Sequence, residues 1–425
     1  MTRRRTIIGA TLGAIVTVLA TLLVLNVSIG DKQIDRRLEH RYAVDDRQFA
    51  RTMGVILGPA LEPGNHVEAL VNGDEIFPAM LKAIRNAERT ITLETYIFWS
   101  GTIGDEFVNA LVERARKGVR VHILLDWIGG KLDEDQITRM QENGVEVRRY
   151  NAPRWNNLHR LNNRTHRKLM VVDGRIGFTG GVGISDPWRG DAGSPAHWRD
   201  THFRVEGPVV GQIQSAFIDN WMQATGEVLH GEAYLPELVP VGTQSAQMFT
   251  SSPGGGSESM QLMYLLSLTS AAKSIRLSAS YFIPDDVALN TLLAALRRGV
   301  RVQIVLPGHH LDRPSVRRAS RAEWGELLRA GAEINEFQPT MYHVKVMIVD
   351  DRWVSVGSTN FDARSFAIND EANLNVYDRE FARQQIDIFE RDLAQSRRVS
   401  LQEWENRPWR DKLLDFLASL LSSQL

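Results

Sequence analysis

The stretch HVKVMIVD at residues 343–350, followed by GSTN at 357–360, decides the fold of this chain. The same pattern occurs upstream as HRKLMVVD at 166–173, followed by GGVG at 180–183. β-Branched and apolar residues dominate both stretches, so each is predicted to form a buried strand. Two copies of one pattern indicate an internal duplication in which two halves build one site.

Side chains two residues apart in a strand point to the same face. His343 and Lys345 therefore share a face, and His166 and Lys168 do the same in the first copy. A nucleophile or proton carrier beside a fixed positive charge suits attack on a phosphate. The pattern predicts a site for phosphate chemistry.

The aspartates that close the two copies, Asp173 and Asp350, each lie an odd number of residues after the histidine. An unbroken strand therefore turns these carboxylates away from the face that carries histidine and lysine. Asp173-Gly174 and Asp350-Asp351 have the composition of hairpin tips. We interpret both aspartates as turn residues.

The regions around the motifs also repeat. RKGVRV at 116–121 corresponds to RRGVRV at 297–302, at nearly the spacing of the two histidines. Helices and strands are predicted to alternate in the same order in both halves. Predicted helices cover 77–87, 105–117, 137–142, 260–273 and 289–298, and predicted strands cover 90–98, 118–125, 145–150, 274–282 and 299–306. This alternation predicts an α/β fold with sheets covered on both faces.

Composition limits the function. The chain has 425 residues, with 50 Lys and Arg against 51 Asp and Glu, which argues against a broad nucleic-acid footprint. It has no cysteine, so disulfides, thiolate metal sites and a cysteine nucleophile are excluded. No cluster of His, Asp and Glu has the spacing of metal ligands, so we expect no metal. We also expect no cofactor.

Residues 6–30 form an uncharged and largely apolar segment. This segment is longer than the about 20 residues that a membrane-spanning helix needs. We predict an uncleaved anchor; the alternatives are a cleaved signal peptide and a buried core helix. Three arginines at 3–5 favour a cytoplasmic N-terminus, but basic residues at 32–41 oppose it, so the membrane side stays open. Gly9 and Gly13 form a G-x-x-x-G pair that would allow a homodimer.

The C-terminal residues 408–425 form a predicted amphipathic helix. Its apolar stripe consists of Trp409, Leu413, Phe416, Leu417, Leu420 and Leu421. This stripe suits either a helix packed on the catalytic body or an interfacial helix lying on a bilayer.

The duplicated motif resembles the signature of the phospholipase D superfamily, from about residue 72 to the C-terminus. Within that superfamily the chain is similar to bacterial cardiolipin synthases. The stretches that carry this similarity are NGDE at 72–75, LETYIF at 93–98, WRDTH at 198–202, YFIPD at 281–285 and RPW at 407–409.

The resemblance implies a fold of two duplicated α/β/α sandwich halves, packed with the active site between them, plus an N-terminal transmembrane helix. The expected division is a transmembrane anchor at 1–30, a connector at 31–64, a first phospholipase D-like half at 65–250, a second half at 251–407 and an amphipathic helix at 408–425. SSPGGG at 251–256 marks the expected hinge between the halves.

The resemblance also implies a two-step, metal-free phosphoryl exchange through a phosphohistidine. It implies a catalytic set of six residues, His166, Lys168, Asp173, His343, Lys345 and Asp350. By family tendency His166 is the nucleophile and His343 the general acid and base, although the symmetric sequence leaves that order open. Such a division of labour predicts a bell-shaped dependence of rate on pH.

Further site residues follow from the same resemblance. Lys168, Lys345 and Asn360 would hold the phosphate oxygens, and Ser358, Gly180 and Gly181 would complete the substrate site. Asp200 and Glu371 would be the acidic partners of the histidines, although the sequence does not tell which acid serves which histidine. In the first copy Gly183 stands where the family usually places asparagine, which removes one phosphate donor.

The implied function is a membrane-bound phosphatidyltransferase that converts two phosphatidylglycerol molecules into cardiolipin and glycerol. The expected partners are therefore phospholipids and a bacterial membrane, with no nucleic acid. The alternatives are a phospholipase D hydrolase that gives phosphatidic acid, a nuclease of the same superfamily, and a catalytically inactive membrane scaffold.

Overall fold

The computed structural model describes residues 2–27, 34, 36–153, 162–253 and 259–421, and within the first helix the side chains of residues 8 and 11–24. Part of the predicted hinge, residues 254–256, lies outside the described residues, as do parts of the predicted connector and tail. Gly9 of the G-x-x-x-G pair is described only as part of the helix backbone.

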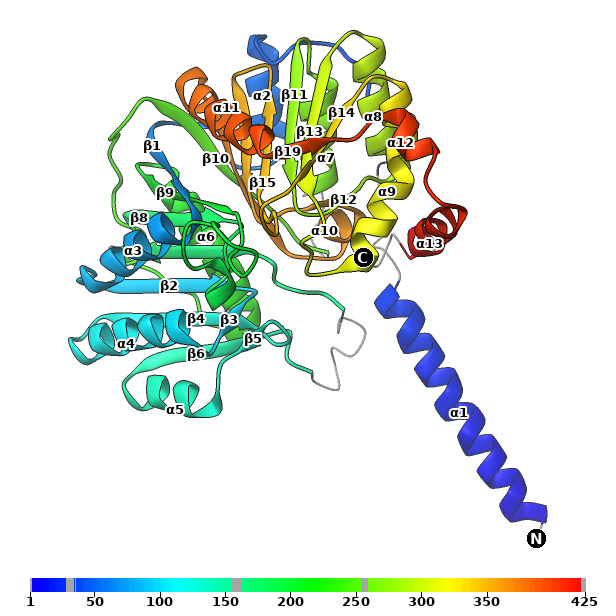
Figure 1. The fold of residues 1–425 in the computed structure, drawn as a ribbon. Coiled ribbons are helices and arrows are strands. Elements are labelled where there is room, and N and C mark those ends of the chain that lie inside the picture. The colour runs from blue at the N-terminus through cyan, green and yellow to red at the C-terminus, as the bar shows by residue number, and fades with distance from the viewer. Residues whose placement is uncertain (1, 28–33, 35, 154–161, 254–258, 422–425) are drawn as a thin grey trace.

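The described residues form a mixed α/β fold built on one 15-stranded sheet that runs through the whole body (Figure 1). The first half contributes β1 (Glu62–Val71), β2 (Thr90–Thr95), β4 (Arg120–Asp126), β6 (Val145–Tyr150), β7 (Lys168–Val172), β8 (Ile176–Gly180) and β9 (Thr201–Glu206). The second half contributes β10 (Gln244–Ser251), β11 (Ser274–Ala279), β13 (Arg301–Pro307), β14 (Glu333–Phe337), β15 (Lys345–Val349), β16 (Trp353–Gly357), β18 (Glu371–Tyr377) and β19 (Ser396–Arg398). Two small two-stranded sheets stand beside it, β3 (Phe98–Trp99) with β5 (Gly130–Lys131), and β12 (Phe282–Ile283) with β17 (Phe361–Asp362).

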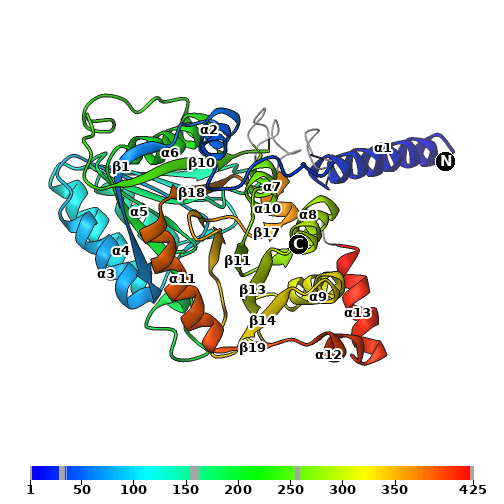
Figure 2. The same ribbon diagram turned by 90° about the horizontal axis from the view of Figure 1, so that it is seen from above.

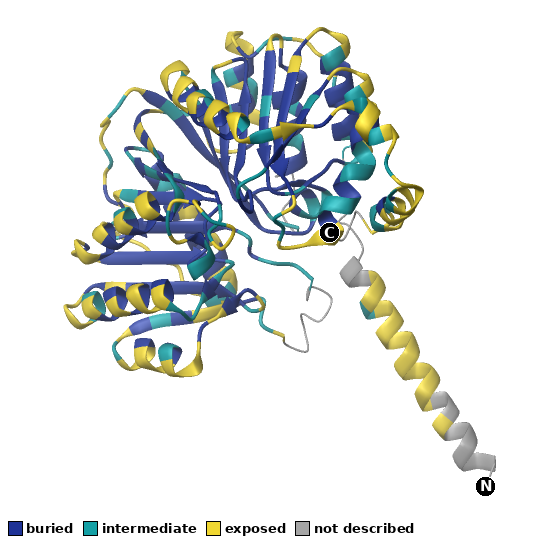
Figure 3. Cartoon of the chain, viewed as in Figure 1, coloured by how far each residue is buried: buried dark blue, intermediate teal, exposed yellow. Residues whose placement is uncertain are grey.

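Helices cover both faces of the sheet, and the strands between them are buried (Figures 2 and 3). The first half carries α3 (Asn72–Arg85), α4 (Thr102–Arg116), α5 (Glu134–Glu142) and α6 (Val210–Thr225), with a short 3-10 helix at Asp186–Trp188. The second half carries α7 (Met260–Thr269), α8 (Asp286–Arg297), α9 (Pro314–Arg329), α10 (Ala363–Ala367), α11 (Arg379–Ala394), α12 (Leu401–Glu405) and α13 (Trp409–Ser419), while α2 (Arg47–Ile56) precedes both halves.

The duplication is visible in the strand order, which is β19-β14-β13-β11-β15-β16-β18-β10-β1-β9-β8-β7-β2-β4-β6. In the first half β2 pairs parallel to β4 and antiparallel to β7. In the second half β11 pairs in the same way with β13 and β15. Each motif strand therefore sits at the same place in its half, as the predicted duplication requires.

The two halves meet at the centre of the sheet. β10 pairs with β18 from Ser245–Tyr377 to Ser251–Glu371, while β1 pairs with both β10 and β9. One buried apolar cluster contains Val171 and Phe203 from the first half together with Val346 and Phe381 from the second. Because interiors pack at crystal-like density, this shared core fixes the two motif strands relative to each other.

The C-terminal helix α13 packs on α9 through its polar side. Asp415 is 1% exposed, and both of its oxygens accept from the Arg321 guanidinium at 2.8 Å. The apolar stripe remains outside, with Trp409 69% and Phe416 58% exposed (Figure 3). The helix is therefore packed on the catalytic body, as one alternative predicted. The contact is made by the polar side of the helix and not by the predicted apolar stripe.

The predicted anchor corresponds to α1 (Thr2–Val27), which stands away from the body (Figure 1). Leu12, Leu19 and Leu23 are among its described side chains, and all three are exposed. The alternative of a buried core helix is therefore wrong. Within the part of the chain that the structure describes, no helix has both the length and the hydropathy to cross a bilayer.

Candidate active site

A cavity of about 600 Å³ lies between the two halves, and both motif histidines line it. His166 stands two residues before the start of β7, and His343 stands two residues before the start of β15. Lys168 lines the same cavity as His166, and Lys345 Nζ lies 3.2 Å from both ring nitrogens of His343. Lys168 Nζ donates to the His166 carbonyl oxygen at 2.7 Å, and Lys345 Nζ donates to that of His343 at 2.8 Å. The predicted sharing of one face by each histidine and lysine is confirmed.

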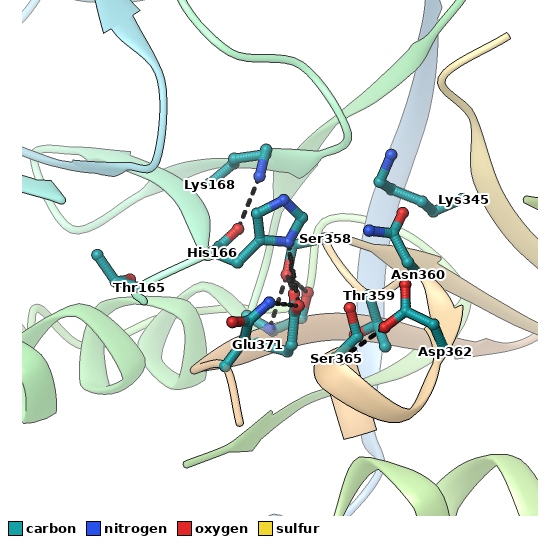
Figure 4. Close-up of polar contacts among 12 residues, drawn as sticks. Thr165, His166, Lys168, Lys345, Ser358, Thr359, Asn360, Asp362, Ser365 and Glu371 are labelled. Carbon is teal, nitrogen blue, oxygen red and sulfur yellow. Dashed lines mark hydrogen bonds and ion pairs between the residues drawn. The ribbon is translucent and has the colours of Figure 1, made fainter. Parts of the chain in front are cut away.

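Each histidine takes its acidic partner from the opposite half. His166 Nδ1 lies 3.0 and 3.1 Å from the two carboxylate oxygens of Glu371, which begins β18 (Figure 4). His343 Nδ1 lies 2.7 Å from Asp200 Oδ2, just before β9. The sequence left this pairing open, and the structure shows that it is crossed.

Main-chain bonds between the halves hold this crossed arrangement. The backbone N–H of His166 donates to the carbonyl of Asp370 at 2.9 Å, and that of His343 donates to the carbonyl of Arg199 at 2.8 Å. Asp370 and Arg199 directly precede Glu371 and Asp200 in the chain. The strand that carries each acid is therefore fixed to the backbone of the histidine it serves.

Both acids are fully buried and bonded on more than one side. Asp200 also accepts from the Trp188 indole N–H at 3.0 Å and from the backbone N–H of Thr201 at 2.8 Å. Glu371 accepts from the Ser358 hydroxyl. Burial acts to raise the pKa of each carboxyl, but the facing histidine and the nearby lysines outweigh it and leave the pKa below its ordinary value. Both groups therefore stay ionised at neutral pH.

The basic groups respond in the opposite direction. Burial lowers the pKa of His166 to about 4, and burial together with Lys345 lowers the pKa of His343. Burial also lowers the pKa of Lys168 to about 7 and that of Lys345 to about 8. With an ionised carboxylate at Nδ1, a neutral imidazole carries its proton there and presents the Nε2 lone pair to the cavity.

Asn360 belongs to a polar chain behind the second lysine. Lys345 Nζ donates to Ser280 Oγ at 2.6 Å, and Ser280 Oγ donates to Asn360 Oδ1 at 2.7 Å. The amide oxygen is thereby used, which leaves the amide N–H groups of Asn360 for the cavity that this residue lines. In Figure 4, Lys345 and Asn360 lie across the site from Lys168.

Aromatic rings brace both imidazoles, and sequence patterns did not identify this role. The Tyr96 ring stands edge-on to His166 at 5.2 Å between centroids. Trp188 and Trp198 contact the His343 ring at 5.2 and 5.5 Å. These rings restrict imidazole rotation and keep water from the His–carboxylate contacts. Trp198 belongs to the WRDTH stretch that carried the family resemblance, and this membership was the sequence signal that could have pointed to its role.

The motif aspartates lie at hairpin tips and not among the residues that line the cavity. Asp173 has φ 53° and Asp350 has φ 52°, and each is the first residue of a three-residue hairpin loop that contains a β-turn. The Asp173 carboxylate accepts three backbone N–H groups, from residues 88–90, at 2.7–2.9 Å. The Asp350 carboxylate accepts three from residues 272–274 at 2.7–2.9 Å. Their interpretation as turn residues is confirmed.

Gly180, Gly181 and Ser358 lie beneath the site, next to the acids. A Cβ on Gly181 would stand 2.3 Å from an Asp200 oxygen, while Ser358 at the matching position donates to Glu371. The glycine makes room for one acid, and the serine bonds the other. These three residues are not among those that line the cavity.

Gly183 occupies the position that matches Asn360 in the other half. A Cβ there would stand 2.7 Å from the Ile97 Cβ, and Ile97 lines the cavity. The space that an asparagine side chain would need is therefore filled. The site is therefore asymmetric, because, of these two matching positions, only Asn360 supplies an amide.

Paired histidine–carboxylate contacts on duplicated strands, with a lysine beside each, define a phospholipase D-like site. A family model described as "Cardiolipin synthase, PLD-like domain" matches residues 80–187 and 264–393. The chain therefore belongs to the cardiolipin synthase family and is an enzyme of the phospholipase D superfamily.

Similar proteins span most of the chain. A cardiolipin synthase of Alkalihalophilus pseudofirmus is 34% identical over 400 residues, covering 93% of this chain and 76% of the relative. Cardiolipin synthase 1 of Staphylococcus aureus is 33% identical over 402 residues, covering 92% of this chain and 81% of the relative. The crystal structure of phosphatidylserine synthase from Haemophilus influenzae matches with a TM-score of 0.68 at 15% identity, covering 89% of this chain and all of that one, which shows the fold.

Proposed function

We propose that the protein joins two phosphatidylglycerol molecules into cardiolipin and releases glycerol. The observation that carries this proposal is the pair of crossed His–carboxylate contacts, His166–Glu371 and His343–Asp200, facing one cavity. Two imidazoles of this kind allow one to act as nucleophile while the other moves protons. Membership of the cardiolipin synthase family supports the choice of substrate.

In the first step, His166 Nε2 attacks the phosphorus of one phosphatidylglycerol. The bond from phosphorus to the glycerol oxygen breaks, and the protonated form of His343 gives its Nε2 proton to that oxygen. Because burial lowers the pKa of His343, this protonated form is a strong acid for the step. Glycerol leaves, and the phosphatidyl group remains on His166. The Glu371 carboxylate accepts a hydrogen bond from the Nδ1–H of His166 and stabilises the positively charged imidazole that forms.

In the second step, His343 is neutral and accepts the proton of the terminal hydroxyl of a second phosphatidylglycerol. The hydroxyl oxygen attacks the phosphorus, and the bond between phosphorus and His166 breaks. Cardiolipin forms, and both imidazoles return to their starting states. Lys168 and the Asn360 amide, which line the cavity, stabilise the negative oxygens of the pentacoordinate phosphorus in both steps. Lys345, which is connected to Asn360 through Ser280, adds its positive charge from behind.

We further infer that the protein works at a membrane, held by α1 and touched by α13. The uncharged residues 6–30 are long enough for a single span. The apolar stripe of α13 faces outward because Asp415 ties the polar side to the body. In both views α13 and α1 lie toward the same side of the body (Figures 1 and 2). Such a helix would rest at the headgroup level of the bilayer.

The test is to incubate the purified full chain with phosphatidylglycerol in mixed micelles and to quantify lipids and glycerol by mass spectrometry. We expect equal molar amounts of cardiolipin and glycerol, lost in His343→Ala. Phosphatidic acid in place of cardiolipin would mean that water is the acceptor. Neither product from the wild type would overturn the proposal, and salt-sensitive DNA cleavage lost in His166→Ala would replace it with a nuclease.

A further inference from the structure

The cavity carries more positive charge than one transferring phosphate uses. Besides the two motif lysines, the guanidinium groups of Arg164, Arg313 and Arg364 belong to its surroundings, and all three residues line it. The whole chain has a formal net charge of −1. Three arginines at one cavity are therefore a local concentration of charge.

These arginines stand close to the reacting groups. The Tyr96 ring that touches His166 is the common neighbour. Burial and a nearby carboxylate raise the pKa of Tyr96, and the charges of Arg313, Arg164 and Arg364 all oppose that rise. Tyr96, His166 and the three arginines all line the same cavity. An anion held by the arginines would thus lie beside the phosphorus that His166 attacks.

Two of the three guanidinium groups are held in place before any ligand arrives. Arg364, in α10 of the second half, donates to the backbone and side-chain oxygens of Asn162 at 2.9 and 3.0 Å. The Arg164 guanidinium lies 5.6 Å from the centroid of the Trp127 ring. Because their orientations are fixed, these groups lose little conformational freedom when they bind an anion. Arg313 precedes α9 and is exposed, so it can close over a ligand.

Two carboxylates of the same wall, Asp362 and Asp312, also accept hydrogen bonds from other groups of the protein. Asp362 caps α10 by accepting the backbone N–H of Ser365 at 2.7 Å, and burial raises its pKa to about 7. Asp312 accepts the hydroxyl of Tyr281. Burial and the neighbouring Arg164 lower the pKa of Arg364, which is the mark of like charges kept together. A bound anion would relieve that repulsion.

We propose that Arg164, Arg313 and Arg364 form a second phosphate subsite, which binds the phosphodiester of the acceptor phospholipid. This inference rests on the proposed function, in which donor and acceptor each bring one phosphate. The donor phosphate lies between the histidines and lysines. The acceptor phosphate lies on the arginines, and the terminal hydroxyl of its glycerol headgroup reaches the phosphatidyl group on His166. The arginines thus favour an anionic lipid over water or a neutral alcohol as acceptor.

The test compares a charged and an uncharged acceptor on the same enzyme. Purified full chain in micelles receives phosphatidylglycerol together with isotope-labelled glycerol. Capture of the phosphatidyl group by a second phosphatidylglycerol gives cardiolipin, and capture by glycerol gives labelled phosphatidylglycerol. Both reactions need the same donor and the same chemistry. Their ratio therefore reports the acceptor subsite alone.

We expect the ratio of cardiolipin to labelled phosphatidylglycerol to fall about 10-fold or more in Arg364→Gln, because a hydrogen bond to a charged group is lost. Arg313→Gln should act in the same direction, and Arg364→Lys should recover part of the ratio. Arg89→Gln is the matched control, since Arg89 is exposed just before the opposite end of β2.

A ratio that is unchanged in both glutamine variants would overturn the subsite, as would an equal fall of both products. Failure of the proposed function gives a different result. The wild type would then make labelled phosphatidylglycerol but no cardiolipin, or neither product. The wild-type reaction thus tests the function, and the variants test the subsite.

Discussion

Because each catalytic histidine contacts a carboxylate of the opposite half, a substitution in one half is predicted to impair the histidine of the other half. Replacing Glu371, in the second half, should impair the histidine of the first half, and replacing Asp200 should impair that of the second. Glu371→Gln should therefore reproduce the defect of His166→Ala in kind, and Asp200→Asn should reproduce that of His343→Ala. Independent active halves would give the opposite pairing.

The size of the effect follows from the geometry. Glu371 is fully buried, and its oxygens lie 3.0 and 3.1 Å from His166 Nδ1. A unit charge about 4 Å from the imidazolium that forms interacts by about 4 kcal/mol at an effective dielectric constant of about 20. The amide of glutamine keeps a hydrogen bond to the imidazole, which recovers about 1–2 kcal/mol. The net loss of about 2–3 kcal/mol corresponds to about 30- to 150-fold in the rate of phosphohistidine formation.

A substrate with a good leaving group separates the two steps. Phosphatidyl-p-nitrophenol needs no proton from a general acid, so its first step depends on the nucleophile alone. Stopped-flow absorbance should show a burst of nitrophenolate in Asp200→Asn, followed by slow turnover. The burst should be slowed about 30- to 150-fold in Glu371→Gln. A full burst in Glu371→Gln with a slowed one in Asp200→Asn would refute either the crossed support or the assignment of His166 as nucleophile, and the two alanine variants then tell which.

Three other outcomes are expected. Burial lowers the pKa of Lys168 to about 7, so its charge is lost as pH rises; kcat/KM should fall above about pH 7, and Lys168→Arg, which stays charged, should move that limb upward. Asp350→Ala loses three backbone hydrogen bonds, so urea unfolding should show a loss of about 3 kcal/mol, whereas a nitrophenolate burst lost as fully as in His166→Ala would contradict a turn role. The chain has no cysteine, so Leu417→Cys on α13 and Arg383→Cys on α11 can each carry a single fluorophore. A lipid-borne quencher should quench the fluorophore on α13 and not the one on α11. Equal quenching at both positions would refute membrane contact by α13.

Local pattern predicted much of the fold. The strand predicted at 145–150 is β6, and the helix predicted at 105–117 is α4, which starts at Thr102. The helix predicted at 137–142 begins earlier, because Asp133 and Gln136 form a capping box at its start. Alternation also gave the shared face of histidine and lysine and the turn role of Asp350. All of these depend on neighbours in the chain.

What the sequence left open depends on contacts between distant residues. Alternation tells which face a side chain takes, but it cannot tell that Glu371 meets a histidine 205 positions away. The arginines at 164, 313 and 364 stayed hidden because their charges are spread along a chain whose total is balanced. Only the fold brings them to one cavity, where the excess charge becomes visible.

The contact at Gly183 makes the difference between the halves hard to undo. Placing an asparagine there would force its Cβ to 2.7 Å from the Ile97 Cβ. Symmetry could return only if Ile97 became smaller at the same time, so each single step back passes through a variant with a clash or a void. Giving the first half an amide donor therefore takes two coordinated changes, one at Gly183 and one at Ile97.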